Sequence, residues 1–80
     1  MSSYRLYGTS ACHLCELAEE MLLALREQGR GVEFEKVDIA ESDSLFERYG
    51  LVIPVLCDSQ GRELFWPFDL EGLCRFIAAD

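Results

Sequence analysis

Two cysteines near the N-terminus, Cys12 and Cys15, form a Cys-x-x-Cys motif, a spacing that suits redox or metal chemistry. They follow a short aromatic segment, Tyr4–Tyr7, and precede a run of apolar residues at helical spacing. A thiol at the start of a helix lies beside unpaired backbone N–H groups and the positive end of the helix dipole. Both favour the thiolate, which is the reactive form of cysteine.

Their positions give the two cysteines different predicted roles. Cys12 comes first, at the exposed start of the helix, and is the predicted nucleophile. Cys15 lies on the same helical face one turn later, more shielded, and is the predicted resolving cysteine. The reaction would be thiolate attack on a disulfide, a mixed-disulfide intermediate and its resolution. An inert, packed pair of thiols is the alternative that the motif leaves open.

The motif encloses His13 and Leu14, and His13 is the only histidine of the chain. A protonated imidazole close to Cys12 would further favour its thiolate. A solvated residue at the start of the helix is an equally good interpretation of His13. Leu14 begins the apolar stripe, which predicts a place in the core or in the lining of a groove.

Metal binding is the competing chemistry, and ligand counting disfavours it. Tetrahedral zinc takes four ligands, commonly from two Cys-x-x-Cys pairs, and this chain has one such pair. The two other cysteines, Cys57 and Cys74, have no partner at ligand spacing and are predicted to be buried small hydrophobic residues. We therefore predict no metal site.

The composition describes a small, acidic, globular protein. Half of the 80 residues are hydrophobic and 28% are charged, which is typical of a folded chain, and the length suits a single domain over residues 1–80. The 15 acidic and 7 basic residues give a net charge of −8. Nucleic acids and anionic membranes attract basic surfaces, so neither is an expected partner.

The chain has no apolar segment of about 18 residues that could span a membrane. Its first residues also lack the apolar stretch of a signal peptide. We therefore expect a cytoplasmic location, where thiols are reduced and a Cys-x-x-Cys motif is redox-active or metal-binding rather than a structural disulfide.

Periodicity and turn residues predict the element order β-α-β-α-β-β-α. The predicted elements are a strand at Tyr4–Tyr7, a helix from Cys12 or His13 to Gln28 with Ser10 as candidate N-cap, a strand at Val32–Ile39, a short helix capped by Ser42 or Asp43 and ending at Gly50, a hairpin of Val55–Asp58 and Arg62–Phe65, and a last helix capped by Asp69. The first two strands are parallel through a helical crossover, and the last two are antiparallel. This predicts a four-stranded mixed sheet with helices on both faces.

Two segments carry a resemblance to a known family: Thr9–Glu16, which reads Thr-Ser-Ala-Cys-His-Leu-Cys-Glu, and Tyr49–Leu56, which reads Tyr-Gly-Leu-Val-Ile-Pro-Val-Leu. With the element order, they resemble the small bacterial glutaredoxin-like proteins of the thioredoxin-fold superfamily. The resemblance covers nearly the whole chain. It implies an α/β thioredoxin fold, with the four-stranded sheet flanked by three helices.

The same resemblance implies a substrate site. It implies that the peptide bond before Pro54 is cis, that Pro54 packs opposite the Cys12 sulfur, and that the backbone of Ile53 pairs with a bound peptide or glutathione. It also implies that His13 and Leu14 tune the redox potential. Asp69 could meet the amino group of glutathione, although a role as helix cap is the preferred interpretation.

The sequence thus predicts a monomeric thiol–disulfide oxidoreductase that acts on protein disulfides or on glutathione and is reduced by another thiol. No covalently bound cofactor is expected, and glutathione is a candidate co-substrate. Two alternatives remain: a glutathione-assisted carrier of an iron–sulfur cluster or metal, and a thioredoxin-fold interaction domain without catalysis.

Overall fold

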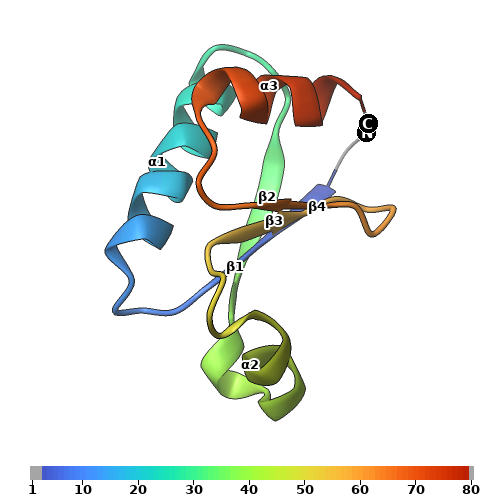
Figure 1. Ribbon diagram of the computed structural model, residues 1–80. Coiled ribbons are helices and arrows are strands. Elements are labelled where there is room, and N and C mark those ends of the chain that lie inside the picture. The colour runs from blue at the N-terminus through green and yellow to red at the C-terminus, as the bar shows by residue number, and fades with distance from the viewer. Residues whose placement is uncertain (1–2, 80) are drawn as a thin grey trace.

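The computed structural model describes residues 3–79. In chain order the elements are β1 (Ser3–Gly8), α1 (His13–Glu27), β2 (Glu33–Asp38), the 3₁₀ helix η1 (Ile39–Glu41), α2 (Asp43–Tyr49), β3 (Val55–Cys57), β4 (Glu63–Phe65) and α3 (Leu70–Ala78) (Figure 1). This is the predicted order with η1 added. No helix in the described part of the chain has the length and apolar character needed to cross a membrane.

The four strands form one mixed sheet in the order β2-β1-β3-β4. β1 pairs with β2 in parallel and with β3 in antiparallel orientation, and β3 pairs with β4 in antiparallel orientation. The predicted four-stranded mixed sheet is confirmed. Because β1 has a neighbour on each side, its carboxyl end, which leads to Cys12, is held between two strands.

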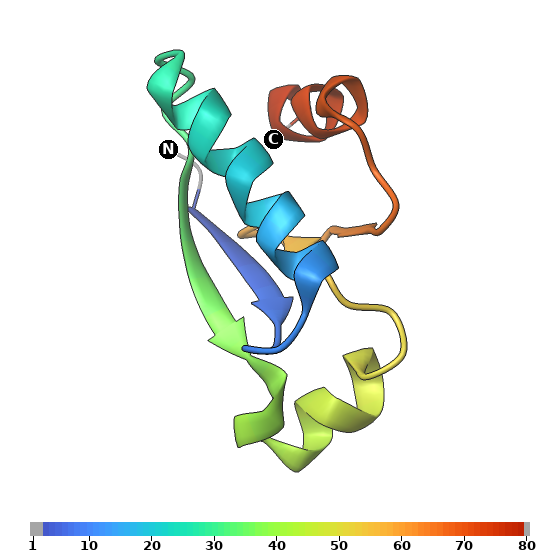
Figure 2. The same cartoon turned by 90° about the vertical axis from the view of Figure 1, so that its left-hand side faces the viewer.

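The side chains of β1 alternate between two cores, one on each face of the sheet. Tyr4 and Leu6 are buried in a cluster with Leu22 of α1 and Leu73 of α3. On the opposite face Tyr7 is buried in a second cluster, together with Ile39, Tyr49 and Val55. In Figures 1 and 2, α1 and α3 lie together at one side of the sheet and α2 lies apart from them. Helices therefore cover both faces, as predicted.

Several element boundaries differ from the prediction by one residue, and at one of them a side chain offers the backbone a competing partner. The second strand ends at Asp38 rather than Ile39, because the Asp38 carboxylate accepts a hydrogen bond from the Ala40 N–H at 2.9 Å and starts η1. The first helix ends at Glu27, one residue before the predicted end, and Gln28 is its C-cap. The chain then turns through Gly29 with a φ of 79°, a conformation that glycine adopts readily.

The predicted caps of the two later helices are found in the structure. The Asp69 carboxylate accepts a hydrogen bond from the Gly72 N–H at 2.7 Å, at the start of α3. The Ser42 hydroxyl accepts one from the Leu45 N–H at 3.4 Å, so Ser42, rather than Asp43, caps α2. Both caps satisfy backbone donors that have no partner within their helix.

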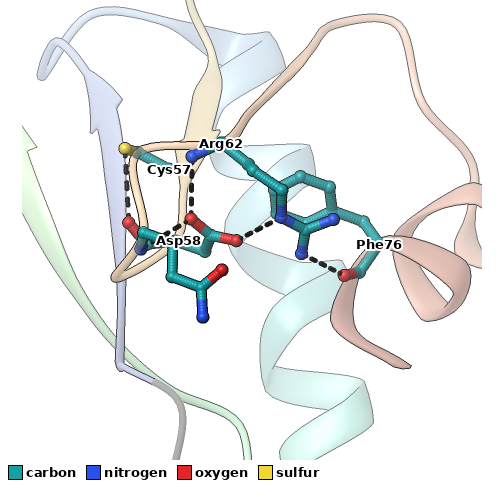
Figure 3. Close-up of polar contacts among 5 residues, drawn as sticks. Cys57, Asp58, Arg62 and Phe76 are labelled. Carbon is teal, nitrogen blue, oxygen red and sulfur yellow. Dashed lines mark hydrogen bonds and ion pairs between the residues drawn. The ribbon is translucent and has the colours of Figure 1, made fainter. Parts of the chain in front are cut away.

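An ion pair between Asp58 and Arg62 closes the hairpin and ties it to α3 (Figure 3). The buried Asp58 carboxylate accepts from Arg62 Nε at 2.6 Å and from the backbone N–H groups of Gln60 and Arg62. Arg62 also donates to the Phe76 carbonyl at 3.1 Å, and its guanidinium lies 4.6 Å from the centre of the Phe76 ring. The predicted hairpin is confirmed, with strands shortened because Asp58 and Arg62 belong to the turn.

Candidate redox site

Cys12 is the N-cap of α1, and its sulfur makes the capping interaction. Its backbone is extended, with φ −110° and ψ 106°, and Cys12 Sγ accepts a hydrogen bond from the Cys15 N–H at 3.1 Å. The suggestion that Ser10 caps this helix is wrong, because Ser10 lies in a turn before Cys12 and the first helical residue is His13. The sulfur thus lies among the unpaired N–H groups of the first turn, where negative charge is stabilised.

Cys12 and Cys15 are joined in a disulfide, with Cα atoms 5.2 Å apart. Cys12 is partly exposed, whereas Cys15 is buried, with 8% of its surface accessible. Cys12 is therefore the cysteine that an incoming group can reach more easily. The difference agrees with the predicted assignment of Cys12 as nucleophile and Cys15 as resolving cysteine, which remains a prediction.

Gly8, the last residue of β1, makes room for the disulfide. A methyl group added at its Cα would lie 2.8 Å from Cys15 Sγ, closer than real carbon and sulfur atoms approach. The sequence pattern marks Gly8 only as the end of the first strand, and the contact with Cys15 depends on how α1 packs back on β1. Gly8 is thus a site residue that sequence reasoning missed.

Strand register places Pro54 beside Gly8, the residue whose Cα faces the Cys15 sulfur. Tyr7 pairs with Val55 in the antiparallel β1–β3 ladder, so the next residues along the two strands, Gly8 and Pro54, are neighbours. Pro54 is fully buried, the Ile53–Pro54 peptide bond is cis, and the Pro54 carbonyl accepts a hydrogen bond from the Trp66 N–H at 3.3 Å. Ile53 is half-buried and continues outward from this point.

The segment from Trp66 to Asp69 lies on the other side of Pro54. Its first peptide bond, Trp66–Pro67, is also cis, which the sequence did not predict. The Trp66 and Phe68 rings meet edge to face, with centroids 5.0 Å apart. Asp69 is engaged as the cap of α3. Figures 1 and 2 show this segment and the loop before β3 on the same side of the sheet as the start of α1.

The two residues between the cysteines point outward. The His13 side chain is 78% exposed, and its Nδ1 lies 3.5 Å from Glu16 Oε1. Leu14 is 43% exposed, so the prediction of a core position for Leu14 is wrong; a place at the rim of a docking surface is compatible with it. Among the apolar residues at helical spacing that begin with Leu14, Ala18 is the first whose side chain is fully buried.

Tyr49 begins the segment that ends at Leu56, but the sequence predicts no role for its side chain; it lies under the loop that leads to Pro54. Its buried ring stacks on Tyr7, with centroids 4.6 Å apart, and its hydroxyl donates a hydrogen bond to Glu63 of β4. Burial and this hydrogen bond raise the pKa of Tyr49 to about 12. Arg48 pairs with the same carboxylate at 3.4 Å, so this cation is occupied within the protein.

The remaining cysteines are not fully buried, which corrects the prediction for them. Cys57 and Cys74 are free thiols of intermediate exposure. Cys57 ends β3 and packs against the cluster that contains Tyr7 and Tyr49, and burial raises the pKa of its thiol. Within residues 3–79, no three His, Cys, Asp or Glu side chains gather closely enough to hold a metal ion.

This chain is similar to a structural genomics target protein from X. campestris, whose structure was solved by X-ray diffraction. The two sequences are 42% identical, the match covers 96% of this chain and 97% of that chain, and the TM-score is 0.83. Protein Ne2328 from Nitrosomonas europaea is 28% identical over 94% of this chain and 89% of its own, with a TM-score of 0.70. A search of curated proteins gave no match.

More distant structures show the fold alone. Oxidised thioredoxin O2 from Arabidopsis thaliana is 22% identical and has a TM-score of 0.68 over 99% of this chain and 74% of its own.

The family model of the glutaredoxin-like domain (DUF836) matches residues 4–78. A Cys12–Cys15 disulfide on this fold supports a thiol–disulfide redox role in general terms. The chain therefore belongs to the glutaredoxin-like domain family and has the thioredoxin fold.

Proposed function

We propose that the chain is a dithiol–disulfide oxidoreductase, an enzyme that exchanges disulfides with protein substrates or with glutathione. The observation that supports this most is the Cys12 sulfur itself. It is partly exposed, caps α1, accepts the Cys15 N–H and lies within bonding reach of the shielded Cys15 sulfur. The helix dipole and the N–H donor stabilise a thiolate on Cys12 once the pair is reduced.

The reaction conserves electrons and protons through two exchanges. The Cys12 thiolate attacks one sulfur of a substrate disulfide, which forms a mixed disulfide and releases one substrate thiolate. The Cys15 thiol loses its proton to solvent and attacks the Cys12 sulfur, which closes the Cys12–Cys15 disulfide and releases the second substrate thiolate. The substrate gains two electrons in total, and a dithiol or two monothiols must return them to the protein.

Single cysteine variants test this function. Cys12→Ser should lose disulfide exchange completely, because no nucleophile remains at the helix start. Cys15→Ser should retain the first step and accumulate a mixed disulfide with the substrate, because the resolving thiol is gone. Intact-mass spectrometry after reaction with a cysteine-containing peptide disulfide would detect the trapped species.

Cys57→Ser and Cys74→Ser serve as matched controls, since each removes one free thiol away from the disulfide. Both should exchange at the wild-type rate. Exchange at an undiminished rate in Cys12→Ser would overturn the proposed function.

A further inference from the structure

All but one of the described basic side chains have an identified partner within the protein. Arg5, Lys36, Arg48, Arg62 and Arg75 each pair with an acidic residue, and Arg26 donates to the Val32 carbonyl while lying over the Phe34 ring. The remaining cation, Arg30, follows the C-terminal end of α1, the end opposite to Cys12. The 15-residue helix is about 22 Å long, so Arg30 is remote from the disulfide.

The surroundings of Cys12 carry more acidic than basic groups. Lys36 lines the same pocket as Gly8 and Cys15, but it is paired with Glu19 at 3.3 Å. The loop from Gly8 to Ala11 contains no charged residue, and Glu16 lies in the first turn of α1 with a side chain that is 63% exposed. Its described ionic neighbour is His13. The segment that leads to Pro54 begins with Glu41, Asp43 and Glu47, which are exposed and have no described Lys or Arg partner. A cation that approaches this side of the molecule is attracted and an anion is repelled.

The same side also exposes apolar side chains. Leu51 is fully exposed, and Val52 is 40% exposed, in the loop that continues into Ile53 and Pro54. Leu14 follows Cys12 by two residues and is 43% exposed. Figure 2 shows the loop before β3 and the first turn of α1 on the same side of the molecule. Exposed apolar residues next to a reactive group suit contact with a protein segment, since each contact removes apolar surface from water.

We propose that this surface docks protein segments whose disulfide is flanked by Lys or Arg and by apolar residues, in preference to glutathione. The proposal rests on the proposed function and specifies its substrate class. Glutathione carries two carboxylates and one ammonium group. Lys36, the described cation in the pocket beside Cys15, is already paired with Glu19, and Glu16 lies exposed in the first turn of α1. A basic protein segment meets the exposed carboxylate of Glu16 and buries Leu14 and Leu51.

The test uses three peptide disulfides that differ only in the residues flanking cysteine, which are Lys, Gln or Glu. Rates of reaction with the reduced protein should fall in that order, by about tenfold from Lys to Glu at low ionic strength. The ratio should approach one at about 1 M salt, where the Debye length is about 3 Å. Oxidised glutathione should react more slowly than the Lys peptide. Equal rates for the three peptides, or a faster reaction with glutathione, would overturn the proposal.

A pair of variants separates local charge from net charge. Glu16→Gln should lower the ratio of the Lys-peptide rate to the Gln-peptide rate by about two- to threefold, since one nearby charge is removed. Glu27→Gln makes the same change at the far end of α1 and should affect neither peptide. An equal effect of the two variants would contradict a docking role for the surface around Cys12.

A second matched pair of variants tests the exposed apolar side chains of this surface. Leu51→Ser should slow all three peptides and leave a small neutral disulfide, hydroxyethyl disulfide, unaffected. Leu23→Ser changes a partly exposed leucine of α1 outside this surface and is the control. Unchanged peptide rates in Leu51→Ser would contradict the apolar contact. If the protein reduces none of the peptides, the proposed function is wrong. If it reduces all three at equal rates, only this inference is wrong.

Discussion

At the scale of single residues, the site depends on the lack of a side chain at Gly8 and on the sulfur atom of Cys12. The Cys15 sulfur fills the space where Gly8 has no side chain, and the Cys12 sulfur takes the place that an oxygen usually has at a helix start. The sequence predicts the identity and order of the two cysteines, because their spacing is specific. It does not predict the sulfur cap, because serine is the commoner capping type and Ser10 stands nearby.

The contact between Gly8 and Cys15 gives a residue-scale prediction. Gly8→Ala places a methyl group 2.8 Å from Cys15 Sγ, so β1 and α1 must separate slightly. We expect the free energy of unfolding of the oxidised protein to fall by about 1–3 kcal/mol, as for other overpacked sites. Urea unfolding followed by circular dichroism measures it. Ser10→Ala, an exposed change in the same loop, is the control, and equal stability of Gly8→Ala and wild type would refute the steric account.

At the scale of elements, local patterns predict every strand and α-helix but not the 3₁₀ helix η1, and tertiary contacts adjust the ends and the exposure of these elements. The helical stripe of α1 and the caps Ser42 and Asp69 can be recognised from the sequence, since they depend on residues a few positions apart. The Tyr49–Glu63 hydrogen bond joins residues 14 apart in different elements, so no local pattern reveals it. The partial exposure of Cys57 has the same origin, because it depends on how residues distant in sequence, such as Tyr7 and Tyr49, pack around it.

The ion pair that joins the hairpin to α3 predicts a pH dependence of stability. Burial alone would raise the pKa of the Asp58 carboxyl, but the hydrogen bonds from Arg62 and Gln60 outweigh it and hold that pKa below its usual value. The folded state therefore gains stability above the unfolded-state pKa of about 3.9 and loses it as pH falls through the lower folded-state pKa. Asp58→Asn removes this contribution.

We expect Asp58→Asn to be less stable than wild type near neutral pH, with a difference that narrows as pH falls below about 4. Urea unfolding at a series of pH values measures the difference. Glu71→Gln, which alters an exposed ion pair with Arg75, should show little change at any pH. A difference for Asp58→Asn that stays constant into the acid range would show that the charge of Asp58 is not responsible.

At the scale of the whole molecule, the charges are unbalanced although most basic groups are paired. The net charge is −8, and the excess carboxylates are spread over the surface without cations to neutralise them. Their mutual repulsion disfavours the compact state, and salt screens it. The acidic composition is evident from the sequence, but the pairing of Lys36 with Glu19 in the pocket beside Cys15 requires the structure, because it depends on which partner each Lys or Arg finds.

This imbalance predicts that salt stabilises the protein. Raising NaCl from about 0.01 M to about 0.3 M should increase the melting temperature by a few degrees, since about 1 kcal/mol corresponds to about 4–8 °C in a domain of this size. Thermal unfolding followed by circular dichroism measures the shift. A melting temperature that falls with salt would mean that the ion pairs contribute more than the repulsion.

The sulfur that caps α1 also gives the protein an internal reporter. The Cys15 backbone proton is donated to Cys12 Sγ, so its electronic environment depends on whether that sulfur is a thiolate, a thiol or part of a disulfide. A serine cap would keep the same oxygen throughout a reaction. In this chain, the amide resonance of Cys15 in an NMR spectrum would distinguish each chemical state of the neighbouring residue without any added probe.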